Sequence, residues 1–94
     1  MPPMTKDEVK ARLLQHEGWE RDSDEIEKKF AFADFKASMA FVNRVAELAE
    51  AADHHPDISI KYNRVKLTLS THSEGGVTEK DFALAAQIDI AANP

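Results

Sequence analysis

Three of the chain's four histidines lie within residues 50–72, and imidazole is the side chain best suited to acid–base chemistry near neutral pH. His54 and His55 are adjacent and precede Pro56, while His72 closes the stretch. Histidine titrates at about pH 6.5, so one imidazole can donate a proton while another accepts one. Such a pair suits the elimination of water: the acid protonates a leaving hydroxyl and the base takes a proton elsewhere on the substrate.

Spacing alone leaves two other interpretations open. The first is structural, because histidine at a helix C-terminus interacts well with the helix dipole and proline often follows a helix end. The second is a zinc site, since three imidazoles can bind the ion and leave one position open. The adjacency of His54 and His55 disfavours zinc, because both must reach one tetrahedral ion. Nucleophilic catalysis has little support, since the chain has no cysteine and no nucleophile-elbow motif.

One long helix is expected to deliver the first two histidines. Asp34 is a candidate N-cap, and the pattern predicts a helix over about residues 35–53. Glu50 and His54 are then i, i+4 neighbours on a face away from the core, where the carboxylate could hold the imidazole. Pro56 cannot continue the helix, so His55 should begin an extended segment. The predicted core stripe of this helix comprises Phe35, Met39, Val42, Ala46 and Ala49, with Phe41, Val45 and Leu48 beside it.

Alternating apolar residues predict the strands. Such alternation runs through residues 26–32, 58–62 and 65–69, and a brief strand is expected at 19–21. Asn63-Arg64 is the predicted hairpin link, with Asn63 tolerating a positive φ. In a period of two, His72 continues the outward-facing positions, and a loop at Gly75-Gly76 follows it.

Capping motifs mark two further helices. Thr5 to Glu8 and Thr78 to Asp81 each have the form of a capping box. The apolar sides are expected to carry Val9, Leu13 and Leu14 in the first helix, and Phe82, Ala85, Ala86 and Ile88 in the last. The order is α-β-β-α-β-β-α, which predicts an α+β fold: a four-stranded, mostly antiparallel sheet with helices packed on one face.

Composition limits the function classes. The length of 94 residues predicts a single domain over 1–94, and so small a core favours assembly into oligomers. The net charge of −5 and the lack of a basic block argue against nucleic-acid binding. Without cysteine there are no disulfides or thiolate metal sites. No apolar run is long enough for a signal peptide or a membrane span, so we expect a cytoplasmic protein without membrane contact.

The spaced motif of the chain resembles the signature of the pterin-4a-carbinolamine dehydratases. It reads Glu50-x-x-x-His54-His55-Pro56, five residues, Tyr62, nine residues, His72, eight residues, Asp81. Residues 62–65 and 67–72, the phenylalanine-rich strand before them and residues 78–81 extend the resemblance over essentially the whole chain. Some members have tryptophan where this chain has Ile58.

The resemblance implies an activity, a site and partners. The activity is dehydration of 4a-hydroxytetrahydrobiopterin to quinonoid dihydropterin, with no metal and no organic cofactor. It implies His54 and His72 as the acid–base pair and His55 as the residue that positions the substrate. The supporting residues it implies are Glu50, Asp53, Pro56, Tyr62, Ser70, Thr71 and Asp81, with Glu50 orienting His54 and Asp81 bracing His72 or the loop before the last helix. It further implies a homodimer or homotetramer and an aromatic amino acid hydroxylase as a candidate partner. The alternative function is a binding or dimerisation cofactor module for a transcription factor or a hydroxylase, without significant catalysis.

Overall fold

A computed structural model describes residues 2–93, which form a four-stranded antiparallel sheet and three helices. The sheet order is β1-β2-β4-β3, and every pairing is antiparallel. The predicted fold class and element order are therefore confirmed, with one added 3-10 turn and boundaries shifted by a residue or so. The elements are α1 (Lys6–Leu13), β1 (Glu20–Asp22), β2 (Glu25–Ala31), α2 (Phe35–Ala52), β3 (Asp57–Lys61), β4 (Arg64–Leu69), the 3-10 turn η1 (His72–Glu74) and α3 (Glu79–Ala92).

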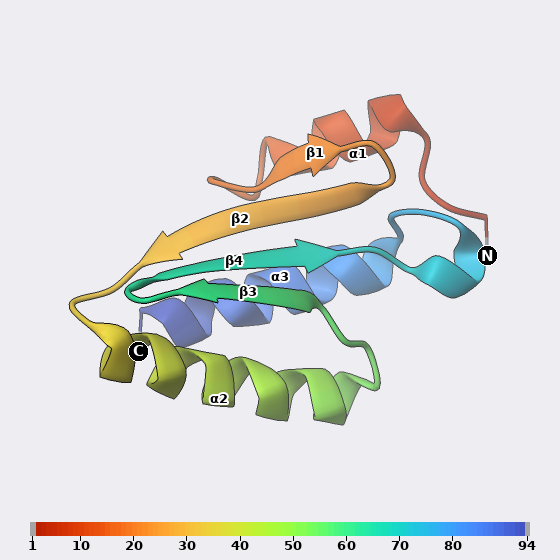
Figure 1. Cartoon of the computed structure of the whole chain (residues 1–94). Helices are drawn as coiled ribbons and strands as arrows, with labels where there is room; N and C mark the ends of the chain where they lie inside the picture. Colours follow the sequence, from red (N-terminus) through yellow and green to blue (C-terminus); the bar gives the residue numbers. More distant parts are fainter. Residues whose placement is uncertain (1, 94) are drawn as a thin grey trace.

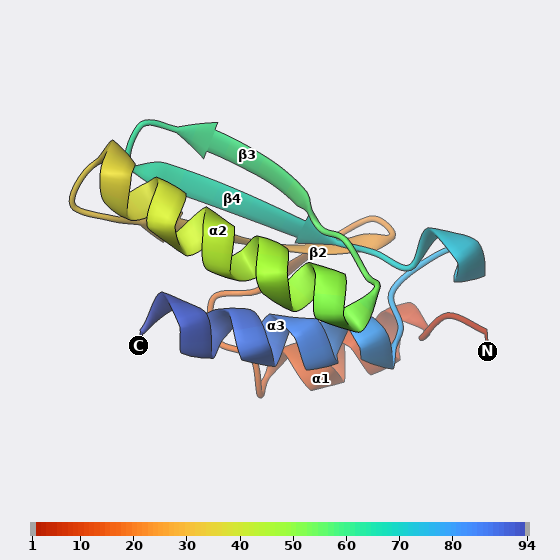
Figure 2. The same cartoon turned by 90° about the horizontal axis from the view of Figure 1, so that it is seen from below.

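The helices cover one face of the sheet and leave the other bare (Figures 1 and 2). Alternation in β4 sends Val65, Leu67 and Leu69 into the core, as predicted, and Ile26 of β2 joins them. α2 and α3 pack side by side against this face (Figure 2). Burying a large aliphatic or aromatic side chain contributes about 1.5–3 kcal/mol, so this layer contact is the main source of stability. The helical side of the core comprises Val9, Phe41, Val45, Ala49, Phe82, Leu84, Ala85 and Ile88.

The predicted core stripe of α2 is confirmed at Ala49, but the rest of the buried face is rotated towards Phe41 and Val45, which were expected beside the stripe. Its buried residues are Ser38, Phe41, Val45 and Ala49, whereas Phe35 is 49% exposed. The physical reason is aromatic packing, because the Phe41 ring lies 4.9 Å by centroid from both the Phe30 and Phe32 rings. Apolar residues occupy more than one face of this helix, so the pattern alone did not select the buried one. Two other predicted core positions, Leu14 and Ala86, are exposed as well.

Lys28 breaks the apolar alternation of β2, and a polar cluster accommodates it. Its Nζ donates to Asp89 Oδ1 at 2.9 Å and to the Glu17 carbonyl at 3.0 Å. The Trp19 indole N–H also donates to the Asp89 carboxylate. A cation on the core-facing side of the strand thus meets a carboxylate from α3 and a backbone acceptor.

The β3–β4 link is Tyr62-Asn63 rather than the predicted Asn63-Arg64, because Lys61 pairs directly with Arg64. Tyr62, not Asn63, adopts the positive φ, at 51°. Asn63 is held by Phe32: the Asn63 side-chain amide donates to the Phe32 carbonyl at 3.1 Å, and the Phe32 N–H donates back to the Asn63 carbonyl at 2.8 Å. These two bonds fix the turn one residue earlier than the sequence suggested.

The predicted helix starts are confirmed. Thr5–Glu8 and Thr78–Asp81 form complete capping boxes, and the Asp34 side chain accepts from the Ala37 N–H at the start of α2. Within residues 2–93, no helix has the length and apolar character needed to cross a membrane.

Candidate active site

The site begins where α2 ends. Asp53 caps the helix in the left-handed conformation, with φ 50° and ψ 43°, a region that aspartate tolerates better than most residues. The His54 N–H then donates back to the Ala49 carbonyl at 3.0 Å, and Pro56 prevents any continuation of the helix. This sharp turn sends the two adjacent imidazoles to different carboxylates.

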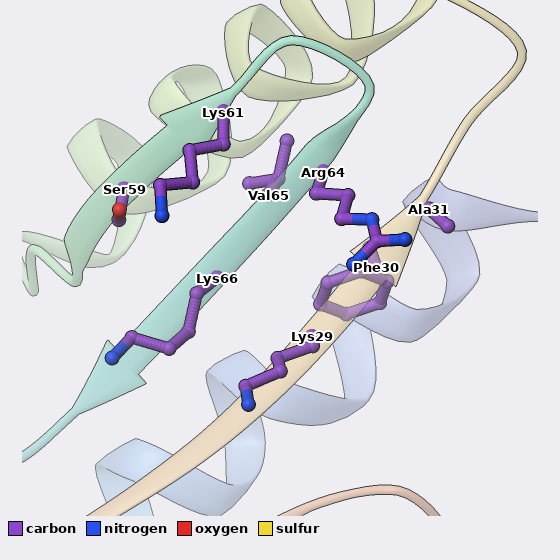
Figure 3. Close-up of a pocket in the computed structure, with 8 residues that line it drawn as sticks. All are labelled: Lys29, Phe30, Ala31, Ser59, Lys61, Arg64, Val65 and Lys66. Atoms are coloured by element: carbon purple, nitrogen blue, oxygen red, sulfur yellow. The ribbon is translucent and has the colours of Figure 1, made fainter.

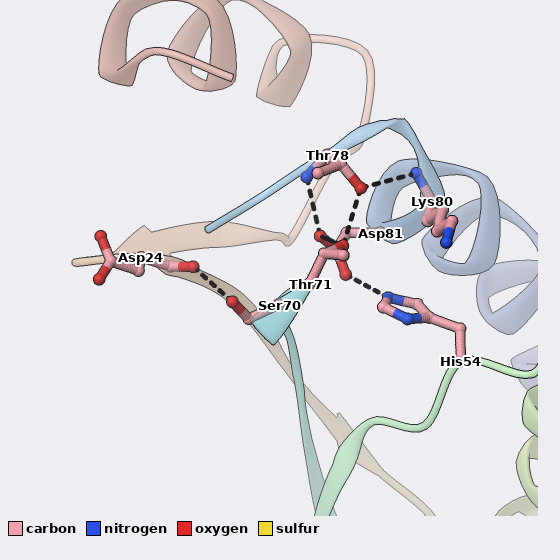
Figure 4. Close-up of polar contacts among 7 residues, drawn as sticks. All are labelled: Asp24, His54, Ser70, Thr71, Thr78, Lys80 and Asp81. Atoms are coloured by element: carbon pink, nitrogen blue, oxygen red, sulfur yellow. Dashed lines mark hydrogen bonds and ion pairs between the residues drawn. The ribbon is translucent and has the colours of Figure 1, made fainter. Parts of the chain in front are cut away.

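His54 turns inward onto α3. Its Nε2 lies 2.5 Å from Oδ1 of Asp81 (Figure 4). Asp81 has no exposed surface, and the His54 side chain is only 11% exposed. A buried carboxylate bonded to one ring nitrogen fixes the orientation of the imidazole, and Nδ1 has no hydrogen-bond partner within residues 2–93.

The other oxygen of Asp81 is held by two threonines. Asp81 Oδ2 accepts from Thr71 Oγ1 at 2.9 Å and from the Thr78 N–H at 2.9 Å (Figure 4). Since the single Thr71 hydroxyl proton goes to Asp81, the Thr78 hydroxyl must donate to Thr71 Oγ1, 2.7 Å away. The Lys80 N–H then donates to Thr78 Oγ1 at 3.2 Å. Every polar group in this hydrogen-bond network has a partner, so the network is rigid and the donor and acceptor of each bond are defined.

This bonding pattern also assigns the His54 tautomer. Asp81 accepts three hydrogen bonds and has no donor to give as a carboxylate, so we assign the proton of the His54–Asp81 bond to Nε2. A neutral His54 then presents the Nδ1 lone pair as a proton acceptor. If Nδ1 takes up a proton, the buried carboxylate stabilises the imidazolium that forms.

His55 turns outward and pairs with Glu50 at the surface. Its Nε2 contacts Glu50 Oε2, and the two side chains are 56% and 77% exposed. The predicted pairing of Glu50 with His54 was therefore wrong. The i, i+4 argument assumed a continuous helix, and the left-handed turn at Asp53 breaks that geometry.

His72 lies on η1, immediately after Thr71, and is exposed. It borders a hollow of about 280 Å³ together with Ser23, Asp24, Glu25, Ser70 and Gly75. Ser70 Oγ donates to the Asp24 carbonyl at 2.8 Å, which ties the end of β4 to the β1–β2 turn (Figure 4). Asp81 braces the loop before α3, as one of the two expectations had it, but the imidazole that it holds is His54 and not His72.

The remaining predicted support residues take different positions. Asp53 shapes the turn through its backbone, and Pro56 is half-buried beside it. Tyr62 lies in the β3–β4 turn, after the end of β3, whereas His54 lies between α2 and the start of β3; 64% of the Tyr62 surface is exposed. Thr78 was identified only as a helix cap, and its hydroxyl proves to be part of the His54 support. The capping box was the sequence signal for this role: one oxygen of Asp81 accepts from the Thr78 N–H, which leaves the other oxygen to bind a further group, here His54.

Comparison with known proteins gives the family. Residues 2–91 match the family model described as "Pterin 4 alpha carbinolamine dehydratase". The chain belongs to the pterin-4a-carbinolamine dehydratase family. A relative from Chloroflexus aurantiacus, named "Putative pterin-4-alpha-carbinolamine dehydratase", is 55% identical over 89 residues, which cover 95% of this chain and 96% of that protein. A relative of the same name from Sulfolobus acidocaldarius is 49% identical over 86 residues, covering 92% of this chain and 94% of that one.

Solved structures of similar proteins share this dehydratase-family fold. The crystal structure of a transcriptional coactivator/pterin dehydratase from Brucella melitensis has a TM-score of 0.92 and 38% identity, covering 97% of this chain and 99% of the other. A second neighbour is a pterin dehydratase-like protein described as a RuBisCO assembly factor in the alpha-carboxysome. It has a TM-score of 0.70 and 30% identity, covering 83% of this chain and 93% of the other. The family fold is thus shared by proteins described in catalytic and in assembly terms.

No group of three or more histidine, cysteine, aspartate or glutamate residues in the described part of this dehydratase-family chain could hold a metal ion. The zinc interpretation therefore has no ligand set there. His54 and His55 also bind separate carboxylates, which directs their rings apart.

Proposed function

We propose that this protein dehydrates pterin-4a-carbinolamine, a 4a-hydroxytetrahydropterin such as 4a-hydroxytetrahydrobiopterin, to the quinonoid dihydropterin and water. The observation that supports it is the His54–Asp81 pair: an imidazole fixed by a fully buried carboxylate, whose second nitrogen, Nδ1, has no hydrogen-bond partner within residues 2–93. Membership of the dehydratase family points to the same reaction class.

The reaction needs one base and one acid. The C4a–O bond breaks, a proton from a ring nitrogen leaves to the base, and the acid protonates the departing hydroxyl, so that water is released and no oxidant is consumed. We assign the acid–base pair to His54 and His72, and the positioning of the substrate to His55. Asp81 acts through His54, because it is wholly buried and touches the imidazole rather than the substrate. No metal and no organic cofactor enters this scheme.

The proposal is tested by the decay of 4a-hydroxytetrahydropterin, followed by stopped-flow absorbance with wild type, His55→Ala, His54→Ala and the double variant His54→Ala/His72→Ala. A general acid or base contributes about 10²–10⁴-fold, so each single variant should keep measurable turnover and the double variant should fall to the buffer rate. His16→Gln is the matched control, because His16 is the histidine left out of the proposed acid–base and positioning set; its ring packs on Phe82, so circular dichroism checks that this variant is folded. A folded wild type that gave no acceleration would contradict the proposal.

A second candidate function is that of a binding module. The similar structures described as a coactivator and as a RuBisCO assembly factor favour it. A module of this kind does not need the His54–Asp81 network for binding, so variants that abolish dehydration would leave partner binding intact. Absence of turnover in folded wild type, combined with retained partner binding, would select this alternative.

The wider setting of the enzyme belongs to the same proposal. We propose one domain over residues 1–94 that assembles as a homodimer or homotetramer and acts in the cytoplasm, where an aromatic amino acid hydroxylase would supply the carbinolamine. So small a domain buries only about 60–68% of its unfolded surface, which supports assembly. Light scattering after size-exclusion chromatography measures the number of subunits. A monomer at micromolar concentration would contradict the proposed homodimer or homotetramer.

A further inference from the structure

The bare face of the sheet carries carboxylates towards one end and cations towards the other, with Lys66 lining the hollows at both ends. Alternation sends residues of odd number in β2 and β3, and of even number in β4, away from the helices. Glu25, Glu27 and Asp57 border a hollow at one end of this face, where β2 and β3 begin. The other end, towards the β3–β4 turn, is cationic.

The cationic end surrounds a hollow of about 460 Å³, within the usual range for small-ligand sites. Lys29, Lys61, Arg64 and Lys66 line it from three neighbouring strands (Figure 3). In the part of the chain that the structure describes, Lys66 alone among these four has a carboxylate oxygen within 4.0 Å, and that contact, to Glu27, is long at 3.8 Å. The positive charge is therefore left largely uncompensated by the protein itself.

The strand register makes this arrangement unfavourable on its own. Lys29 lies directly opposite Lys66, and Lys61 directly opposite Arg64. Like charges at directly opposed positions destabilise a sheet. Both pairs lie on the same face of the sheet, although the chain as a whole has a net charge of −5. A bound anion would reduce the repulsion between these cations.

The neighbouring acidic end selects the kind of anion. A long polyanion such as single-stranded nucleic acid would run from the cations onto Glu27 and Asp57 and be repelled. A second copy stacked on this face would bury lysines and carboxylates, which are depleted at protein interfaces. A compact multivalent anion avoids both costs, and phosphate oxygens match the planar fork of the Arg64 guanidinium.

We propose that this hollow binds a compact multivalent phosphate, either free or carried by a small organic molecule, at a site separate from His54 and Asp81. Lys29, Lys66 and Arg64 hold the phosphate oxygens, and Lys61 adds charge from β3. The observation that carries the assignment is the juxtaposition of two opposed like-charge pairs around one hollow.

Pyrophosphate is the first probe, with ADP and AMP as arms that separate a free from an organic source. At about tenfold excess over the Kd, binding to the folded chain should raise Tm by roughly 5–10 °C above a sodium chloride control of equal ionic strength. Amide chemical-shift changes should centre on residues 29, 61, 64 and 66. If pyrophosphate binds more tightly than the nucleotides, the ligand is a free anion. If ADP binds more tightly than both pyrophosphate and AMP, the ligand is an organic diphosphate.

The deciding variants are Lys29→Gln/Lys66→Gln and the matched control Lys10→Gln/Lys36→Gln, which removes the same charge from helices. The first pair should weaken pyrophosphate binding at least about tenfold and raise the Tm of the free protein, because the opposed charges are gone. The control pair should retain wild-type affinity. Equal loss in both variants, shift changes centred elsewhere, or tighter binding of a 20-nucleotide single strand than of pyrophosphate would overturn the proposal.

Discussion

His54 and His55 are neighbours in sequence, and each contacts a carboxylate, yet the two pairs lie in opposite environments. The His54–Asp81 pair is buried and belongs to a network with Thr71 and Thr78, whereas the His55–Glu50 pair is exposed on the surface. Exposed ion pairs contribute about 0–1 kcal/mol, because water screens them and the side chains lose freedom. Removing one partner of a buried pair costs about 3–5 kcal/mol, because the other is left without compensation. Burial, rather than contact with a carboxylate, thus decides which imidazole is held in a defined orientation.

The largest effect is expected from the carboxylates. Asp81→Ala leaves three donors without an acceptor and removes one half of the capping box of α3, so the free energy of unfolding should fall by about 3–5 kcal/mol. Glu50→Ala should change it by less than about 1 kcal/mol. Urea denaturation measures both. Should Asp81→Ala fail to fold, Asp81→Asn retains one acceptor oxygen and should lose about 1–3 kcal/mol. Equal losses of unfolding free energy in the Asp81 and Glu50 variants would show that burial does not distinguish the two histidine–carboxylate pairs.

The imidazoles should show the same contrast more weakly. His54→Gln should destabilise the fold by about 1–3 kcal/mol, since the amide reaches Asp81 less well, and His55→Gln by less than about 1 kcal/mol. Thermal unfolding measures the difference. A readout of orientation accompanies it: in ¹⁵N-edited NMR, His54 should show a single Nε2–H tautomer, and His55 an average over both. A mixed tautomer for His54 would show that Asp81 does not fix the ring.

The hydroxyl of Thr71 sharpens the comparison further. Thr71→Val keeps the shape of the side chain but removes the donor to Asp81 and the acceptor for Thr78, so we expect a loss of about 1–2 kcal/mol. Thr71→Ser keeps the hydroxyl and should lose less than about 1 kcal/mol. Chemical denaturation of the two variants, side by side, separates the hydrogen bonds from packing. A serine variant as unstable as the valine variant would assign the effect to the methyl group.

Local signals predicted the elements of this fold well, because each depends on residues close in sequence. The two capping boxes, the Asp34 cap and the apolar alternation of β4 all appear as expected. The rotation of α2 was missed because its buried face is chosen by aromatic rings of β2 and the residue after it, which the helix sequence does not contain.

For the candidate site residues, the structure tests only the carboxylate partner of each imidazole, and these partners were predicted wrongly. Glu50, His54, His55 and Asp81 were identified, yet the partners were exchanged, because a single left-handed residue at Asp53 turns the chain between the two histidines. Asp81, the acidic residue that holds His54, lies 27 residues after it in the sequence. Sequence spacing can propose such a contact, but only the packing of α3 against the end of α2 brings it about.

The two capping boxes extend the comparison to pH, with the smallest expected effect. Glu8 and Asp81 occupy the same third helical position, but Glu8 is exposed. The backbone N–H of Thr5 donates to the Glu8 carboxylate and, together with the Thr5 side chain, holds its pKa below the usual value. A lowered pKa means that this contribution to stability is complete above the unfolded pKa of about 4.3 and is lost as the pH falls through the folded pKa. The stability difference between wild type and Glu8→Gln, measured by thermal unfolding, should therefore be larger at pH 6 than at pH 3. A difference that stayed constant over this range would show that the Glu8 charge contributes nothing to the cap.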